Sequence, residues 1–239
     1  MSRLSSLTAR IADVDWQDAG SRLDAEGWAR LPSLLMDSEC ASLRRGYTDG
    51  SLYRSTIDME RYRFGRGEYK YFAYPLPQIV AALRETLYPL LQPIANTWWE
   101  RLRRQADFPP TLAEFIERCH TGGQTRPTPL ILRYRPGDYN CLHQDVYGDL
   151  AFPLQVSVML SQRQRDYEGG EIVLAEQRPR AQSKATAITL ERGDGLVFTN
   201  RERPARGSRG WYAVQMRHGV SPLARGERFV LGVIFHDAK

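Results

Sequence analysis

The sequence has few cysteines and no long apolar run. Its three cysteines, Cys40, Cys119 and Cys141, are an odd number without a CxxC pair, which argues against a disulfide framework and against a thiolate zinc site. No apolar run has the length that a membrane-spanning helix needs, and the first residues lack the apolar core of a secretory signal. We therefore expect a cytoplasmic protein with no membrane partner.

The charge balance excludes few classes of protein or partner. The 239 residues carry a formal net charge of +5, and 42% of them are hydrophobic and 26% charged, which is ordinary for a globular protein. Arginine supplies most of the positive excess. A mild excess of this kind is common on proteins that bind no polyanion, so it does not identify a partner. The oligomeric state cannot be read from the sequence.

The first half of the chain carries mainly helical patterns. Its strongest helical stretch, Gln78–Arg104, has apolar residues on one face, and Pro89 and Pro93 are expected to kink or split that helix. The segment Tyr53–Tyr74 is dense in tyrosine and arginine. It is either a loop or ribbon that contacts substrate, or a surface segment that lays aromatic and basic side chains over the core.

The second half of the chain reads as short strands without intervening helices. The strand-like runs are separated by glycine-rich turns, and they are 130–134, 154–160, 171–174, 185–190, 195–198, 212–216 and 228–235. Such a series indicates a β-sandwich, barrel or jelly roll. We expect one domain over residues 1–239, with residues 1–127 as a helical support region and residues 128–239 as the β core.

Two histidines and an aspartate form a candidate metal site. His143 and Asp145 are two positions apart, so on a strand both side chains leave the same face. His218 follows another strand-like run about seventy residues later, and a jelly roll brings strands that are distant in sequence side by side. Two histidines and one carboxylate are the facial triad of non-haem iron oxygenases, although a zinc hydrolase also uses three such ligands.

Arg228 favours the oxygenase over the hydrolase. It starts the last strand-like run, ten residues after His218, and an arginine inside a barrel is costly unless it meets an anion. A dicarboxylate co-substrate would supply that anion through a bidentate contact. The alternative is an exposed arginine beside Glu227.

Residues 128–236 resemble the double-stranded β-helix (cupin-like jelly roll) core of the Fe(II)/2-oxoglutarate-dependent oxygenases, especially the prolyl-hydroxylase-like branch. The resemblance also extends to bacterial members linked to oxidative dealkylation of DNA. The segments that carry it occur in the family's order and spacing: Tyr134-Arg135-Pro136-Gly137-Asp138, His143-Gln144-Asp145, Tyr167-Glu168-Gly169-Gly170-Glu171, Gly193-Asp194-Gly195-Leu196-Val197-Phe198, His218-Gly219-Val220 and Arg228.

The resemblance implies a dioxygenase that couples oxidative decarboxylation of 2-oxoglutarate to hydroxylation of a C–H bond. It implies Fe(II), 2-oxoglutarate and O2 as cofactor and co-substrates, with ascorbate as a candidate reductant. His143, Asp145 and His218 match the iron ligands. Arg228 matches the residue that binds the distal carboxylate of 2-oxoglutarate, and Tyr134 matches a tyrosine that helps to hold it. A second tyrosine of the family is absent from residues 154–160, and Gln155 or Ser157 would take its place.

The substrate is left open between classes. The spacing from His218 to Arg228 favours hydroxylation of a peptidyl or free amino acid or another small molecule. The alternative is oxidative dealkylation of alkylated DNA or RNA bases, which the basic loops would suit. Against it, the spacing is shorter than in AlkB-like dealkylases, and Ile234 stands where those enzymes have a second arginine. A third hypothesis is a cupin-like module that binds a metal without turnover.

Overall fold

The computed structural model describes residues 3–105, 107–145 and 148–239. Residues 1–2 and 106 of the expected region 1–127, and residues 146–147 of the expected region 128–239, lie outside the described residues. The described residues form five α-helices, all in the first half of the chain: α1 (Arg3–Ala12), α2 (Trp16–Glu26), α3 (Asp37–Gly46), α4 (Gln78–Arg101) and α5 (Leu112–Thr121). Among the described residues, every helix is too short or too polar to span a lipid bilayer.

In the part of the chain that the structure describes, fifteen strands are distributed over three sheets. The major sheet has the order β1-β11-β7-β15-β5-β4-β2, the minor sheet has the order β10-β9-β13-β6-β3 with β12 paired to β13, and β14 pairs with β8. The strands are β1 (Trp28–Leu31), β2 (Tyr53–Asp58), β3 (Gly65–Arg66), β4 (Glu68–Phe72), β5 (Leu130–Tyr134), β6 (Tyr139–His143), β7 (Leu154–Met159), β8 (Tyr167–Gly169), β9 (Ile172–Gln177), β10 (Lys184–Ile188), β11 (Gly195–Thr199), β12 (Glu202–Gly207), β13 (Gly210–Val220), β14 (Leu223–Gly226) and β15 (Arg228–Val233).

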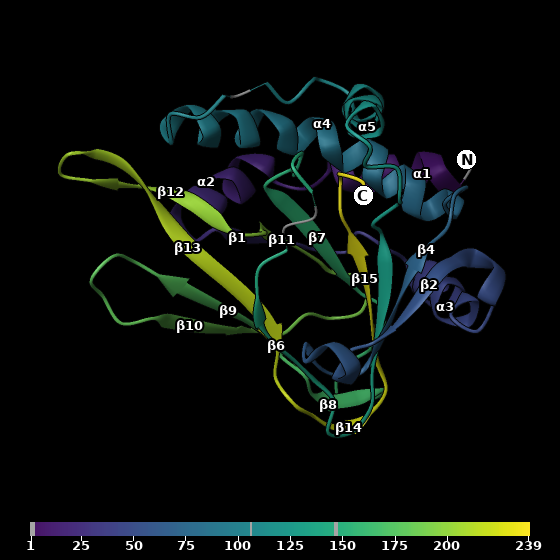
Figure 1. Cartoon of the computed structure of the whole chain (residues 1–239). Coiled ribbons are helices and arrows are strands. Elements are labelled where there is room, and N and C mark those ends of the chain that lie inside the picture. The colour runs from purple at the N-terminus through teal and green to yellow at the C-terminus, as the bar shows by residue number, and fades with distance from the viewer. Residues whose placement is uncertain (1–2, 106, 146–147) are drawn as a thin grey trace.

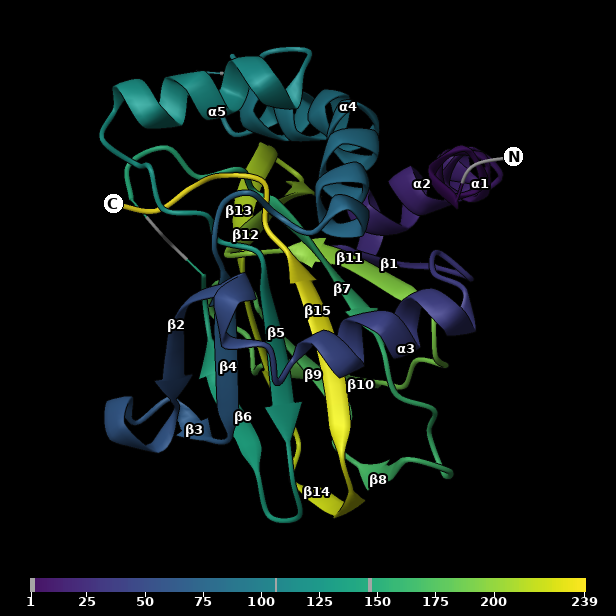
Figure 2. The same ribbon diagram turned by 90° about the vertical axis from the view of Figure 1, so that its right-hand side faces the viewer.

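The helices cover the outer face of the major sheet. Figure 1 shows α4 and α5 along one side of the molecule, and Figure 2 shows α3 crossing the same sheet near β15. One continuous core joins the helices to outward side chains of the sheet, such as Leu87 and Trp98 of α4 with Val156 and Val158 of β7. The major sheet is therefore supported from behind, which holds its inner face rigid.

The inner faces of the two sheets enclose a second apolar core. Because strand side chains alternate between faces, Val156 and Val158 of β7 pack on the helices while Gln155 and Ser157 line a pocket between the sheets. This core includes Met159, Leu174, Phe198 and Met216. The architecture is the mainly β, double-stranded β-helix fold that the sequence predicted, and all seven predicted strand runs are strands.

The first half of the chain contains strands as well as helices. β2 and β4 form an antiparallel ribbon, and β4 joins the major sheet through β5. A ribbon is one of the forms expected for residues 53–74. The same segment also contains β3, a strand of two residues that pairs with β6 in the minor sheet. The amino-terminal region thus builds part of the pocket wall instead of only supporting it from outside.

The prolines of the long helix were expected to kink or split it, and the split does not occur. α4 runs from Gln78 to Arg101 and contains both Pro89 and Pro93. The two prolines lie four residues apart on the exposed side of α4, where water can bond the carbonyl groups that lose their helical partners. The opposite side, with Leu87 and Leu91, is buried and holds the helix together.

Candidate active site

His143 and His218 face each other across neighbouring strands. β6 pairs with β13 in antiparallel register, and His218 stands directly opposite His143. The centroids of the two rings are 4.2 Å apart. The prediction that distant strands bring these histidines together is confirmed.

Asp145 completes the cluster from just beyond the end of β6. Its backbone N–H donates to the carbonyl of Asn200 at 3.3 Å, which keeps the chain extended past the strand. Gln144 turns the other way and donates to the carbonyls of Arg201 and Met216, both at 2.9 Å. The carboxylate of Asp145 therefore lies on the histidine side, with Oδ1 at 3.3 Å from His143 Nε2 and Oδ2 at 3.0 Å from His218 Nε2.

The geometry leaves nitrogen lone pairs directed at the centre of the cluster. His143 Nδ1 lies 2.8 Å from the carbonyl oxygen of Cys141, and because a carbonyl only accepts, Nδ1 carries the proton and Nε2 is free to act as a ligand. Donor atoms of His143, Asp145 and His218 all lie within 4.8 Å of one another. This donor set of two imidazoles and one carboxylate fits a divalent transition metal such as Fe(II).

The cluster is electrostatically matched to a cation. Burial works to raise the pKa of Asp145, but the adjacent His218 and His143 outweigh it and hold that pKa well below the usual range. Burial lowers the pKa of His218, and the charge of Asp145 only partly offsets this. The site therefore favours an ionised carboxylate, the state that binds a metal, and the same carboxylate outweighs burial at His143 and raises the pKa of that ring.

One pocket brings together all seven residues that the sequence indicated. It has a volume of about 370 Å³ and is lined by His143, Asp145, His218, Arg228, Tyr134, Gln155 and Ser157. Apolar side chains such as Leu132, Phe198 and Val230 line much of the remainder. The pocket is thus a partly apolar chamber with a few converging polar groups, as small-molecule sites usually are.

Arg228 is buried without a counter-ion. Its side chain is 1% exposed, its Nε and Nη1 atoms make no hydrogen bond, and within the described part of the chain no carboxylate pairs with it. Burial lowers the pKa of its guanidinium. The alternative of an exposed arginine beside Glu227 is wrong, because Glu227 lies 3.4 Å from Arg135 instead. A buried, unpaired guanidinium in a pocket fits an anionic ligand.

Tyr134 stands beside Arg228. The two residues are cross-strand partners in β5 and β15, and the guanidinium carbon lies 5.4 Å from the centroid of the tyrosine ring. The Tyr134 hydroxyl is buried without a hydrogen-bond partner, and burial raises the pKa of Tyr134 to about 12. A neutral phenol and a cation therefore offer donors to the same region of the pocket, which suits a carboxylate.

Gln155 is directed at the metal cluster in this structure. Its side-chain amide donates to Asp145 Oδ2 at 2.8 Å and lies 3.4 Å from His218 Nε2. This contact suits a residue that orients a metal ligand, whereas the sequence suggested a contact with 2-oxoglutarate. Ser157 follows Gln155 by two residues on β7, so its side chain lies on the same face of the strand and also lines the pocket. Its role as a contact of 2-oxoglutarate stays a prediction.

Tyr69 and Asn140 are among the pocket residues that had no individual role in the sequence interpretation. Tyr69 of β4 and Asn140 of β6 both line the chamber, and burial raises the pKa of the Tyr69 phenol. The only sequence signal for Tyr69 was its place in the tyrosine- and arginine-rich segment. Asn140 gave no sequence signal, because which of its neighbours share its face can be inferred only once β6 is known to be a strand.

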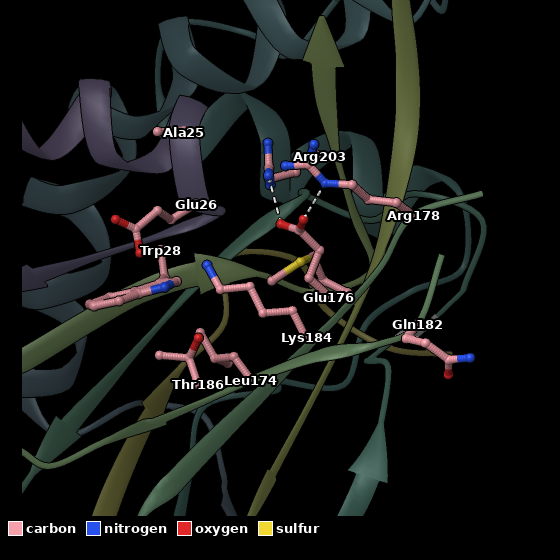
Figure 3. A pocket seen from close by; sticks show the side chains of 11 residues that line it. Ala25, Glu26, Trp28, Leu174, Glu176, Arg178, Gln182, Lys184, Thr186 and Arg203 are labelled. Carbon is pink, nitrogen blue, oxygen red and sulfur yellow. Dashed lines mark hydrogen bonds and ion pairs between the residues drawn. The ribbon is translucent and has the colours of Figure 1, made fainter. Parts of the chain in front are cut away.

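A separate polar pocket lies beyond Met216 on the minor sheet. Figure 3 shows Glu176 between Arg178 and Arg203, with Trp28 on the opposite wall. The carboxylate of Glu176 lies 2.6 Å from each guanidinium, so both arginines already have a counter-ion within the wall. This pocket contains none of the candidate metal ligands, and we place the chemistry at the His143 cluster.

Most of the chain matches a known family. Residues 67–238 match the family model Oxygenase-NA, described as an oxygenase catalysing oxidative methylation of damaged DNA. An uncharacterized protein from each of two Mycobacterium tuberculosis strains is 53% identical over 167 residues, which covers 70% of this chain and 72% of the relative.

Solved structures share the fold at low sequence identity. A prolyl-4-hydroxylase of Pseudomonas putida is 14% identical with a TM-score of 0.55, and covers 91% of this chain and 96% of its own. An oxidoreductase of the 2OG-Fe(II) oxygenase family from Burkholderia pseudomallei is 15% identical with a TM-score of 0.52, and the coverages are 95% and 94%. With the His-Asp-His cluster, these findings support the predicted use of Fe(II), 2-oxoglutarate and O2.

Proposed function

Since the chain belongs to the Oxygenase-NA family, we propose that it is an Fe(II)- and 2-oxoglutarate-dependent dioxygenase that removes alkyl groups from damaged nucleobases by oxidation. The observation that carries the proposal is one pocket that holds both the His143, Asp145 and His218 cluster and the buried, unpaired Arg228. The family description supplies the substrate class.

Each part of the chemistry has residues suited to it. His143, Asp145 and His218 would hold Fe(II), which with 2-oxoglutarate and O2 supplies hydroxylation of a C–H bond as 2-oxoglutarate is converted to succinate and CO2. Hydroxylation of an N-alkyl carbon gives a hemiaminal, which releases an aldehyde and restores the N–H group of the base. Arg228 and Tyr134 would bind the distal carboxylate of 2-oxoglutarate.

The remaining side chains orient these groups and exclude water. Gln155 holds Asp145 through its amide, and the carbonyl of Cys141 fixes the tautomer of His143. Leu132, Phe198 and Val230 present apolar walls to the chamber. Exclusion of water strengthens the electrostatic contacts inside the chamber and suppresses side reactions.

A peptidyl or free amino acid is the second candidate substrate, and a specific observation favours it. Arg228 lies ten positions after His218, and Ile234 occupies the position of the second arginine of AlkB-like dealkylases. Ile234 is 2% exposed and lines the pocket. The chamber therefore lacks one cation that those dealkylases carry.

The proposal is tested by release of succinate from 2-oxoglutarate. Protein loaded anaerobically with Fe(II) is given O2 and a single-stranded oligonucleotide with one N-methylated base, the same oligonucleotide without the methyl group, a proline-containing peptide, or free amino acids. We expect the methylated oligonucleotide to stimulate succinate release and to yield formaldehyde in equal amount. His143→Ala should abolish both. His120→Gln, which changes a histidine outside this pocket, is the matched control.

Arg228→Ala should raise the KM for 2-oxoglutarate on the order of 100-fold, since removing one side of a buried charge pair costs about 3 kcal/mol. Iron binding should change far less, and Arg228→Lys should recover part of the affinity. Succinate release that survives His143→Ala would disprove the metal assignment. Stimulation by the peptide or an amino acid alone would replace the nucleobase with the second candidate.

A further inference from the structure

The chamber is small compared with any nucleic-acid substrate. Its volume of about 370 Å³ is near the lower end for ligand pockets, and 2-oxoglutarate would occupy part of it. Only one base of a strand can enter, so the neighbouring nucleotides must lie on the rim. The composition of the rim therefore decides what is recognised.

Exposed apolar side chains gather at this rim. The described residues expose seven large apolar side chains, and four of them lie on β6 or on the segment that packs beside it: Tyr62, Phe64, Tyr139 and Leu142. Leu142 directly precedes the candidate ligand His143 on β6, and both Phe64 and Leu142 line the chamber. Exposed aromatic clusters next to a pocket usually mark a binding surface.

Tyr62 and Phe64 form a stacked pair that is exposed to solvent. Their ring centroids are 5.6 Å apart and their planes are 19° from parallel, and the two side chains are 53% and 47% exposed. The rings stack on each other and leave outer faces to solvent. A flat aromatic face of this kind matches the face of a nucleobase.

Three arginines flank the stacked pair in the sequence. Arg61, Arg63 and Arg66 lie within the same stretch and are exposed. Arg63 also lines the chamber, whereas Arg66 lies 3.6 Å from Asp138. Within the described residues, Arg61 and Arg63 form no ion pair, so their charges are available to phosphate groups.

Backbone hydrogen bonds tie this stretch to β6 and to the residues before it. The carbonyl of Phe64 accepts a hydrogen bond from Cys141 N–H at 2.8 Å, and Phe64 N–H donates to the carbonyl of Met59 at 3.0 Å. A Cβ atom on Gly65 would lie 2.4 Å from the carbonyl oxygen of Tyr139, so glycine allows the close approach to β6. Figure 2 shows β3 beside β6. The stacked pair is thus presented by a fixed support.

We propose that Tyr62, Phe64, Arg61 and Arg63 form a platform for single-stranded nucleic acid, which stacks the bases that flank the one in the chamber. Tyr62 and Phe64 bind base faces, and Arg61 and Arg63 bind the phosphates between them. This inference rests on the proposed function. It adds that recognition of the strand depends on stacking outside the pocket and tolerates any flanking sequence.

The experiment measures binding of a single-stranded oligonucleotide that carries one N-methylated base and 2-aminopurine as its neighbour. Emission of 2-aminopurine is quenched when the base stacks. We expect wild-type protein to quench it, and Phe64→Ala and Tyr62→Ala each to weaken binding roughly 5- to 100-fold and to restore emission. Phe64→Trp should retain both properties. Arg63→Ala should reduce the salt dependence of binding.

Trp211→Ala is the matched control. Trp211 is also exposed, at 41%, but it lies on the hairpin of β12 and β13 and not on the rim, so both readouts should be unchanged. Thermal unfolding of each variant verifies that it is folded.

The outcomes separate the two proposals. If wild-type protein oxidises the methylated oligonucleotide and Phe64→Ala leaves its affinity and the quenching unaltered, the platform is wrong and the proposed function stands. If the oligonucleotide neither binds nor reacts at low salt, the platform and the nucleobase substrate both fail. A proline-containing peptide that binds in a Phe64-dependent manner, without competition from the oligonucleotide, would assign the surface to peptides.

Discussion

His236 lies in the interior, just after the last strand. It is fully buried, and its Nδ1 accepts a hydrogen bond from the backbone N–H of Phe152 at 3.2 Å. Burial, and secondarily the charge of Arg84, lowers its pKa to about 4. Protonation would remove the acceptor and place a charge in the core, so the folded protein requires the neutral ring.

This environment predicts a specific acid sensitivity. The unfolded chain binds a proton at His236 below a pH of about 6.5, whereas the folded chain binds it only near pH 4, so stability falls as the pH falls between these values. The free energy of unfolding should drop by about 2 kcal/mol more in wild type than in His236→Gln between pH 7 and pH 4.5. Urea titrations at the two pH values measure this difference. Equal drops in the two proteins would show that His236 is not the group responsible.

At the scale of elements, the close contact of β6 and β13 sets the position of both candidate histidine ligands. Gly219 follows His218 on β13, and a Cβ atom there would lie 2.6 Å from the carbonyl oxygen of Asn140 on β6. The absence of a side chain lets the two strands approach closely enough for His218 to stand opposite His143.

Gly219→Ala should therefore push β6 away from β13. We expect a loss of stability of about 1–3 kcal/mol, typical of overpacking, together with weaker metal binding. Calorimetric titration with Co(II) and urea unfolding measure the two effects. Gly50→Ala is the control, because a Cβ atom at Gly50 meets nothing within 4 Å. Unchanged metal affinity in folded Gly219→Ala would mean that the strand contact does not position the ligands.

The elements differ in how far the sequence predicts them. β5, β7 and β15 are rich in Val, Ile, Leu and Phe, and His143 and Asp145 follow from the alternation of side chains on a strand, so these parts were predictable. The pairing of β4 with β5 joins residues about sixty positions apart, and no local pattern contains that information. Gln155 is similar, because its contact with Asp145 depends on how β7 sits opposite β6.

At the scale of the whole molecule, a metal would cross-link β6 and β13 of the minor sheet, next to a contact with the major sheet. His143 and His218 belong to the minor sheet, and the carboxylate of Asp145 is held by Gln155 of the major sheet. A ligand that binds only the folded state stabilises it. We also propose that residues 1–239 act as one folding unit, because one apolar core includes both helices and strands.

Metal binding should accordingly be visible in global unfolding. Co(II) at about one hundred times its dissociation constant should stabilise the protein by about 2.7 kcal/mol, a rise in Tm of about 5 to 10 °C. EDTA should reverse the rise, and His218→Ala should not show it. Scanning calorimetry measures all three. A similar rise in His218→Ala would place the metal elsewhere.

The position of β15 has a consequence for synthesis of the protein. β15 lies in the middle of the major sheet, between β7 and β5, yet it is the last strand along the chain. Until residues 228–233 have left the ribosome, the strands on either side of the gap remain as two separate halves with unpaired edges. Such edges readily pair with other chains. We therefore expect a chain truncated before β15 to aggregate through the free edges of β5 and β7.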